Sequence, residues 1–122
     1  MQQGPLTMYQ QYATGLLVVE SLAHQQPIGL CGLLKRIELA QPDLGFAFLP
    51  EYRNYGFALE AAQLLLADVC ERKLTEKVLA ITSVDNDKSI NLLKKLNFTF
   101  AGLIRLGDSV DETNLFELIL KT

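Results

Sequence analysis

Apolar residues in this chain recur at two spacings, which divide it into expected strands and helices. Apolar runs of strand length lie at 15–21, 28–37, 44–49, 77–82, 98–106 and 113–120, each bounded by turn or polar residues. Residues 57–72 and 87–96 instead place apolar side chains at helical spacing. Met1 to Tyr12 has no decisive pattern, and we expect at most one or two helical turns there.

The order of these elements predicts the topology. The first three strands are joined by short turns, which predicts an antiparallel meander. The run 77–82 is continuously apolar, as in a strand covered on both faces. Since a helix joins it to 44–49, these two strands should be parallel and roughly adjacent. The last two runs predict a closing hairpin, so residues 1–122 form a single α/β domain with a mixed sheet.

Individual residues support particular turns and caps. Asp85 or Asn86 is placed to cap the second helix, because short polar side chains accept hydrogen bonds from the first turn. Asn97 occupies the left-handed position that follows a helix. Gly29 and Gly32 lie within an expected strand and indicate a bulge or close packing.

Composition excludes several classes of partner. The chain has 122 residues, 49% of them hydrophobic, and a net charge of −3, which argues against a nucleic-acid partner. No apolar run reaches membrane-spanning length and no signal-peptide pattern is present, so we expect no membrane partner. Cys31 and Cys70 lie in apolar patterns and predict buried, reduced thiols in a cytoplasmic setting. His24 is the single histidine and the two cysteines are far apart in the sequence, so no metal site is expected.

The stretch from Asp43 to Ala62 is the strongest candidate for a binding site. It reads as a strand, a turn closed by Pro50, a glycine-containing segment and a helix. The first turn of a helix presents backbone N–H groups and partial positive charge, which suits a phosphate. Gly56 lets the backbone approach a ligand or adopt a positive φ, and Arg53 adds a fixed charge. An ordinary helix start after a proline turn is the alternative interpretation.

Three stretches together resemble one known family. The segment R53-N-Y-G-F-A58 resembles the acetyl-CoA loop of the GNAT N-acetyltransferase superfamily. Upstream, D43-L-G-F-A-F-L-P-E-Y-R53 resembles its central strand and the following turn, and S83-V-D-N-D-K-S-I-N-L-L-K-K-L-N-F98 resembles a later strand exit and helix. The ribosomal-protein-type N-acetyltransferase branch is the most similar.

The resemblance implies a GNAT-like acyl-CoA N-acyltransferase fold that is short at its N-terminus. Members of the family usually carry a first strand and two helices before the hairpin, and these wall one side of the acceptor site. Their absence here leaves three alternatives open: a shortened chain, a fragment, or completion of the site by a second chain in a homodimer.

The resemblance also assigns roles around acetyl-CoA, the co-substrate. The pantetheine arm would enter between two splayed parallel strands and pair with main-chain groups near Phe48 and Leu49. The pyrophosphate would be lined by Arg53, Asn54, Tyr55, Gly56, Phe57 and Ala58. Asn86 would meet the pantetheine or thioester, and Ser89 would protonate the leaving thiolate, which makes these two the catalytic candidates. Each role has a purely structural alternative. Phe48 and Leu49 could simply pack in the core, and Arg53 could be an ordinary surface residue. Asn86 could be a helix cap, and Ser89 could be a first-turn serine that bonds locally.

No general base stands out among the residues. Asp43 and Glu20 have suitable chemistry but are expected to face solvent, and the turn position of His24 argues against it. A water chain, or a residue from the missing N-terminal part, is the alternative.

From the resemblance as a whole we expect an acetyl-CoA-dependent N-acetyltransferase acting on a primary amine of a small molecule or protein N-terminus. A non-catalytic CoA-binding or interaction domain and an incomplete fragment remain the alternatives, whereas no phosphate-binding G-x-x-x-x-G-K-[ST] motif is present.

Overall fold

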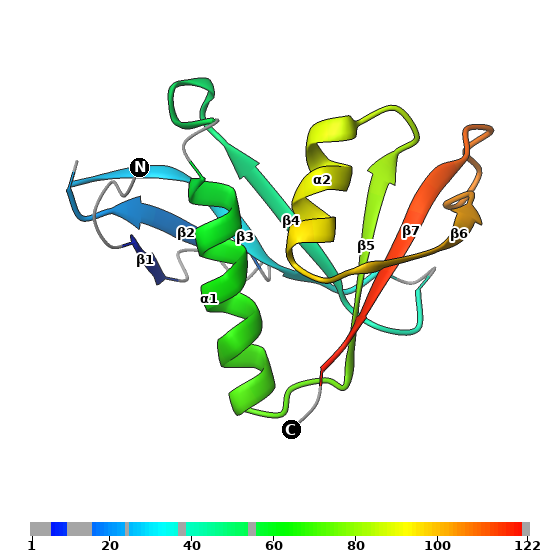
Figure 1. The fold of residues 1–122 in the computed structure, drawn as a ribbon, viewed down its shortest axis with the longest axis horizontal. Coiled ribbons are helices and arrows are strands. Elements are labelled where there is room, and N and C mark those ends of the chain that lie inside the picture. Colours follow the sequence, from blue (N-terminus) through cyan, green and yellow to red (C-terminus); the bar gives the residue numbers. More distant parts are fainter. Residues whose placement is uncertain (1–5, 10–15, 24, 37–38, 54–55, 121–122) are drawn as a thin grey trace.

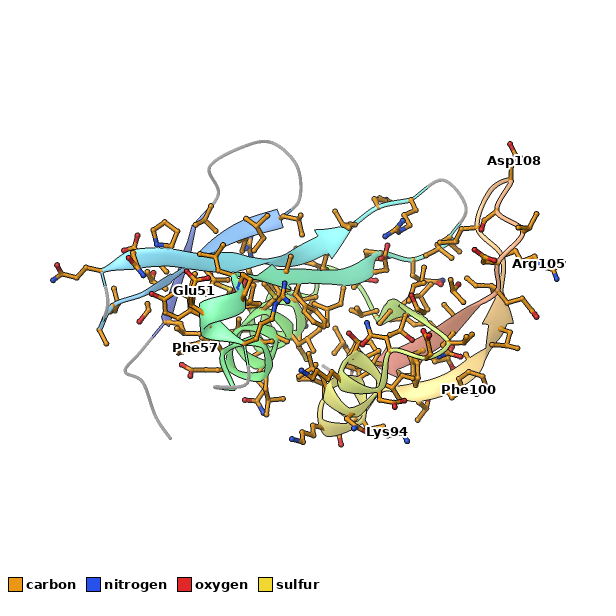
Figure 2. All side chains as sticks on the ribbon, turned by 90° about the horizontal axis from the view of Figure 1, so that it is seen from above. Glu51, Phe57, Lys94, Phe100, Arg105 and Asp108 are labelled. Atoms are coloured by element: carbon orange, nitrogen blue, oxygen red, sulfur yellow. The ribbon has the colours of Figure 1, made fainter. Side chains whose placement is uncertain are left out.

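The fold is one seven-stranded sheet with two helices packed on the same face (Figures 1 and 2). The computed structural model describes residues 6–9, 16–23, 25–36, 39–53 and 56–120. The strands lie in the order β1-β2-β3-β4-β5-β7-β6. Along the chain the elements are β1 (Leu6–Tyr9), β2 (Leu16–Ser21), β3 (Gln26–Leu34), β4 (Asp43–Phe48), the 3₁₀ turn η1 (Pro50–Tyr52), α1 (Phe57–Glu71), β5 (Lys77–Ser83), α2 (Asp87–Lys95), β6 (Thr99–Ile104) and β7 (Thr113–Ile119). The predicted α/β class with a mixed sheet is confirmed.

The antiparallel meander of β2, β3 and β4 is confirmed, with small shifts at its ends. β3 begins at Gln26 and ends at Leu34, so Pro27 lies in the strand rather than in the preceding turn. Pro27 is opposite Glu20, beside an irregularity in β2, where a residue without an N–H is tolerated. A Cβ on Gly29 would lie 2.6 Å from the Ala47 carbonyl oxygen, which confirms the close packing predicted there.

Helical turns were expected within Met1 to Tyr12, and the part of this segment that the structure describes, residues 6–9, is instead a strand; residues 1–5 and 10–12 lie outside the described residues. Residues 6–9 form β1, which pairs antiparallel with β2, with Met8 opposite Val19. Leu6 is buried in the core beneath α1. Four residues are too few to show a local pattern, and this strand is therefore specified by the neighbour it pairs with.

The start of α1 carries the left-handed residue that the sequence suggested. Gly56 has a φ of 80°, and the helix begins at Phe57. The helix packs one apolar face over β3 and β4, and residues in its middle turns, such as Ala61 and Leu65, are fully or almost fully buried. Burial of this face holds the N-terminus of α1 at the carboxyl end of β4.

The second helix begins at the predicted cap. The Asn86 side chain accepts a hydrogen bond from the Ser89 N–H at 3.2 Å. Leu93 and Leu96 are buried as expected, and Ile90 is partly buried. Asn97 has a φ of 71°, which confirms the left-handed position after the helix.

The two parallel strands β4 and β5 are adjacent, as predicted, but they barely pair. Their register contains a single pair, Asp43 with Leu79, at the amino end of β4. In contrast, β5 pairs with β7 at seven positions. Figure 1 shows β4 and β5 diverging toward their carboxyl ends, which leaves a V-shaped opening in the middle of the sheet.

The closing hairpin of β6 and β7 is confirmed, and β7 lies inside it against β5. The core lies between the helices and the sheet. Cys31 is fully buried, and burial raises the pKa of its thiol to about 12. Cys70, predicted to be buried, is only partly so, because it lies at the edge of the apolar face of α1; neither thiol forms a disulfide. Among the residues that the structure describes, no helix is long and apolar enough to cross a membrane.

Candidate functional site

A cavity of about 640 Å³ lies on the helix side of the opening between β4 and β5. It brings together three stretches that are far apart in the sequence: the end of β4, the turn into α1, and the start of α2. Seven of the ten predicted site residues line it, namely Phe48, Arg53, Gly56, Phe57, Ala58, Asn86 and Ser89. Asn54 and Tyr55 lie outside the described residues, and Leu49 does not line the cavity.

The start of α1 forms one wall of this cavity. The first helical hydrogen bond runs from the Glu60 N–H to the Gly56 carbonyl oxygen at 3.0 Å, so Ala58 and Leu59 precede the regular ladder. A Cβ on Gly56 would meet nothing within 4 Å. Glycine is therefore favoured at this position by the positive φ and not by crowding within the chain. The open space beside it is where a ligand can approach the backbone.

Arg53 is exposed, but its side chain is held by a hydrogen bond to the backbone. The Arg53 Nε donates a hydrogen bond to the Phe48 carbonyl oxygen at 3.1 Å, and the backbone N–H of Arg53 donates to the Pro50 carbonyl oxygen at 3.3 Å. This contact fixes the guanidinium at the end of β4, against the cavity. Since one of its five N–H donors is used in that bond, the rest of the group can serve an anion.

The backbone groups that face the opening can be read from the pairing of β4. The Leu49 N–H donates to the Ile28 carbonyl oxygen at 3.0 Å, so it faces β3. Backbone direction alternates along a strand, so the N–H and C=O groups of Phe48 and Phe46 face β5 and the opening. Of the two positions expected to meet the pantetheine through main-chain groups, Phe48 is suitably oriented and the Leu49 N–H is already engaged. Phe46 was missed, although the two-residue repeat of a strand points to it.

The start of α2 forms the opposite wall. Asn86 and Ser89 both line the cavity, so the cap at Asn86 coexists with a position in the cavity wall. Ser89 is partly buried. Since the N-termini of α1 and α2 both border the cavity, two helix dipoles place partial positive charge there.

Three cationic side chains line this cavity, Arg53, Lys88 and Lys95, and none of its described lining residues is acidic. The whole chain has a net charge of −3, so this local excess runs against the overall balance. Nothing in the local sequence distinguishes Lys88 or Lys95 from the ordinary solvent-exposed lysines of a helix. Cations together with helix N-termini make this cavity suited to an anionic ligand.

A second cavity of about 410 Å³ lies at the same opening and reaches toward the helix-free face of the sheet. It shares Phe46, Ala47, Asn86 and Ser89 with the first cavity. The two spaces therefore meet beside Ser89, with the divergence of β4 and β5 between them.

The expectation that Asp43 faces solvent is wrong. Asp43 lines the second cavity, yet only 2% of it is exposed, and Arg36 donates its Nε to the carboxylate at 3.0 Å. Burial raises the pKa of Asp43 above its usual value, and the Arg36 hydrogen bond and charge partly oppose this. Arg36 was missed because nothing in the sequence shows that the connection between β3 and β4 returns to the strand. Glu20 lines neither of these two cavities.

Residues 5–99 match the family described as acetyltransferase (GNAT) domain. The chain belongs to this GNAT acetyltransferase family. Among proteins of curated function, none matches the sequence. The GNAT match covers both walls of the first cavity, including the turn before α1 and all of α2.

Solved GNAT acetyltransferases share this fold. A GNAT-family acetyltransferase from Bacillus anthracis aligns over 86% of this chain with a TM-score of 0.74 and 20% identity. A ribosomal-protein-S5-alanine acetyltransferase from Vibrio fischeri aligns over 87%, with a TM-score of 0.72 and 18% identity. A dodecameric spermidine N-acetyltransferase from Vibrio cholerae aligns over 86%, with a TM-score of 0.71 and 19% identity. This chain spans 66%, 62% and 64% of the lengths of those proteins.

Proposed function

We propose that this GNAT domain is an acetyl-CoA-dependent N-acetyltransferase that transfers an acetyl group to a primary amine. The observation that carries the proposal is the 640 Å³ cavity with three cations, two helix N-termini and an open strand edge. This combination fits a long ligand that has phosphates at one end and hydrogen-bonding amides along its arm.

Each wall has a distinct role in this proposal. The start of α1 and Arg53 bind the pyrophosphate, because backbone N–H groups and a guanidinium are good phosphate donors. The backbone groups of Phe48 and Phe46 pair with the pantetheine amides, as an added strand would. Lys88 and Lys95 add positive charge along the α2 side of the cavity.

The chemistry takes place where the two cavities meet. A neutral amine attacks the thioester carbonyl carbon, the carbon–sulfur bond breaks, and the amine loses a proton while the thiolate gains one. Ser89 is the proposed proton donor to the sulfur, and the proton released by the amine returns to the serine oxygen through water, so no net proton is gained or lost. Asn86 holds the first turn of α2 so that the hydroxyl is positioned. Holding the two reactants in line supplies the larger part of the rate enhancement.

The acceptor amine enters from the second cavity. That cavity reaches Ser89 from the side of the sheet opposite the helices, so donor and acceptor approach from different directions. Two of the solved structures with this fold are named for their acceptors, spermidine and an alanine of ribosomal protein S5. These names support an amine acceptor for this chain.

The first test is binding by isothermal titration calorimetry, followed by thiol release with a panel of amines. Acetyl-CoA should bind and ATP should not, and at least one amine should release free CoA. Ser89→Ala should lower kcat while leaving the affinity for acetyl-CoA within about twofold, since a proton donor acts mainly in the transition state. A folded protein that does not bind acetyl-CoA at millimolar concentration would falsify the proposal.

A non-catalytic CoA-binding domain is the second candidate. It is favoured by the absence of a carboxylate among the described lining residues of the first cavity, and by the pairing of Asp43 with Arg36 in the second. This candidate predicts binding of acetyl-CoA without amine-dependent thiol release. The two functions are therefore separated by the second half of the same test.

We also propose a homodimer in a cytoplasmic setting. The dodecameric spermidine N-acetyltransferase supports self-association in proteins of this fold, and two cysteines that form no disulfide support a reducing compartment. Light scattering coupled to size-exclusion chromatography measures the oligomeric state directly, and a monomer at micromolar concentration would contradict the dimer.

A further inference from the structure

The second cavity contains one paired cation and anion, and their exposure is very unequal. The Arg36 side chain is 40% exposed, whereas that of Asp43 is only 2% exposed. Asp43 therefore lies behind Arg36 as seen from solvent, so the guanidinium is the charged group that a ligand can reach. These two are the ionisable side chains among the described residues that line this cavity.

The contact between them leaves the outer part of the guanidinium for a ligand. Asp43 accepts a hydrogen bond from Nε, at 3.0 Å. The two Nη groups form the planar fork that matches a carboxylate in bidentate geometry. Asp43 restricts the rotation of Arg36, so less conformational freedom is lost when a ligand binds.

The size and charge of the cavity limit the class of acceptor. Its volume of about 410 Å³ is in the range of small-molecule sites. It extends from Arg36 to Ser89, where the transfer takes place in the proposed function. A polycationic acceptor such as a polyamine would be matched by several carboxylates, but here one carboxylate is covered by an arginine.

We propose that Arg36, oriented by Asp43, binds a carboxylate of the acceptor, so that the preferred acceptors are small amino acids with a free amine and a free carboxylate. This inference rests on the proposed function, because it names the acceptor class of that same site. Arg36 is the residue that determines specificity, and Asp43 is a positioning residue that acts through it.

The test uses pairs of acceptors that differ only in the carboxylate, each amino acid being compared with its own carboxamide and its decarboxylated amine. For the wild-type protein, kcat/KM should be about 10- to 100-fold higher for the carboxylate member, the range expected for a charge-assisted hydrogen bond. In Arg36→Lys, which retains the charge but loses the fork, most of this preference should disappear through KM. Arg105→Gln is the matched control, because Arg105 is exposed, does not line the cavity and lies at the closing hairpin (Figure 2).

A double variant, Arg36→Gln with Asp43→Asn, guards against misfolding, since it leaves no charge buried without a partner. Binding of the same acceptor pairs is also followed by thermal shift without acetyl-CoA, so the result does not depend on turnover. Stabilisation by the carboxylate member in the wild type, and its loss in both Arg36 variants, supports the proposal. An equal response to both members of a pair, or an unchanged preference in Arg36→Lys, overturns it while acetyl-CoA binding still stands. Failure to bind acetyl-CoA, in contrast, overturns the proposed function and leaves the carboxylate result to be read from thermal shift alone.

Discussion

The ion pair of Arg36 and Asp43 should respond very differently to removal of one partner or the other. Arg36→Gln leaves a carboxylate of 2% exposure without its charged donor. Loss of a partner from a fully buried pair costs about 3 to 5 kcal/mol, but Arg36 is 40% exposed, so we expect a smaller loss of about 2 to 3 kcal/mol of unfolding free energy. Asp43→Asn leaves a guanidinium that water can solvate, and we expect a change within about 1 kcal/mol.

The pH dependence follows from the direction of the Asp43 pKa. Burial raises the pKa in the folded protein above 3.8, so the folded state binds the proton more readily than the unfolded chain. The stabilising contribution of protonated Asp43 is thus present below pH 3.8 and is lost as the pH rises through the folded pKa. Arg36 lowers the pKa of Asp43, so that pKa rises further in Arg36→Gln. Because a protonated Asp43 carries no buried charge, the loss of unfolding free energy in Arg36→Gln should be smaller at pH 5 than at pH 7.5.

Urea unfolding followed by circular dichroism measures both effects. With a slope of about 1.5 kcal/mol per molar, the midpoint of Arg36→Gln should fall by about 1.3 to 2 M at pH 7.5. The midpoint of Asp43→Asn should stay within about 0.7 M of the wild type. A loss of unfolding free energy in Asp43→Asn as large as that in Arg36→Gln would contradict this prediction. So would a loss in Arg36→Gln that is the same at both pH values, because the unequal burial of the two charges would then not determine the stability of the pair.

Three further changes test other parts of the molecule. Gly29→Ala places a Cβ 2.6 Å from a backbone oxygen and should cost about 2 to 3 kcal/mol, measured by thermal unfolding; a loss under 0.5 kcal/mol would show that the strands can separate there. Asn86→Ala should remove about 1 kcal/mol by loss of the cap, seen as faster hydrogen exchange in the first turn of α2, whereas Asn86→Asp should retain protection. Lys95→Gln should weaken acetyl-CoA binding about threefold at low salt and less at high salt. Lys94→Gln is the control, because Lys94 lies on the outer side of α2 in Figure 2, and it should leave the affinity unchanged. Equal effects of the two variants would show only a general charge effect.

Local chemistry was enough to predict the two helices and the backbone conformations and cap at their ends. The positive φ of Gly56, the cap at Asn86 and the left-handed Asn97 each depend on residues next to them in the sequence. The parallel pairing of β4 with β5 follows from the crossover rule, which also needs only the order of elements.

The features that were missed depend on contacts between distant parts of the chain. The strand β1 exists because β2 offers an edge, and its four residues show no period of their own. The position of β7 between β5 and β6 cannot be obtained from a hairpin pattern, since either strand of the hairpin could face β5. The Arg36–Asp43 pair forms only after the connection between β3 and β4 has folded back.

The single paired position between β4 and β5 has a mechanical consequence. The two halves of the sheet, β1 to β4 and β5 to β7, are each extensively hydrogen-bonded, whereas one register position and the packing between α1 and α2 join them. This seam has the fewest paired positions of any strand junction in the sheet, so we expect it to deform most easily and to set the width of the cleft. A bound pantetheine arm that pairs with β4 and also contacts α2 would supply backbone hydrogen bonds that β5 does not make. It would thereby hold the two halves of the sheet together more rigidly. Amide protons on both sides of the seam should then exchange more slowly with ligand, including those far from the cleft.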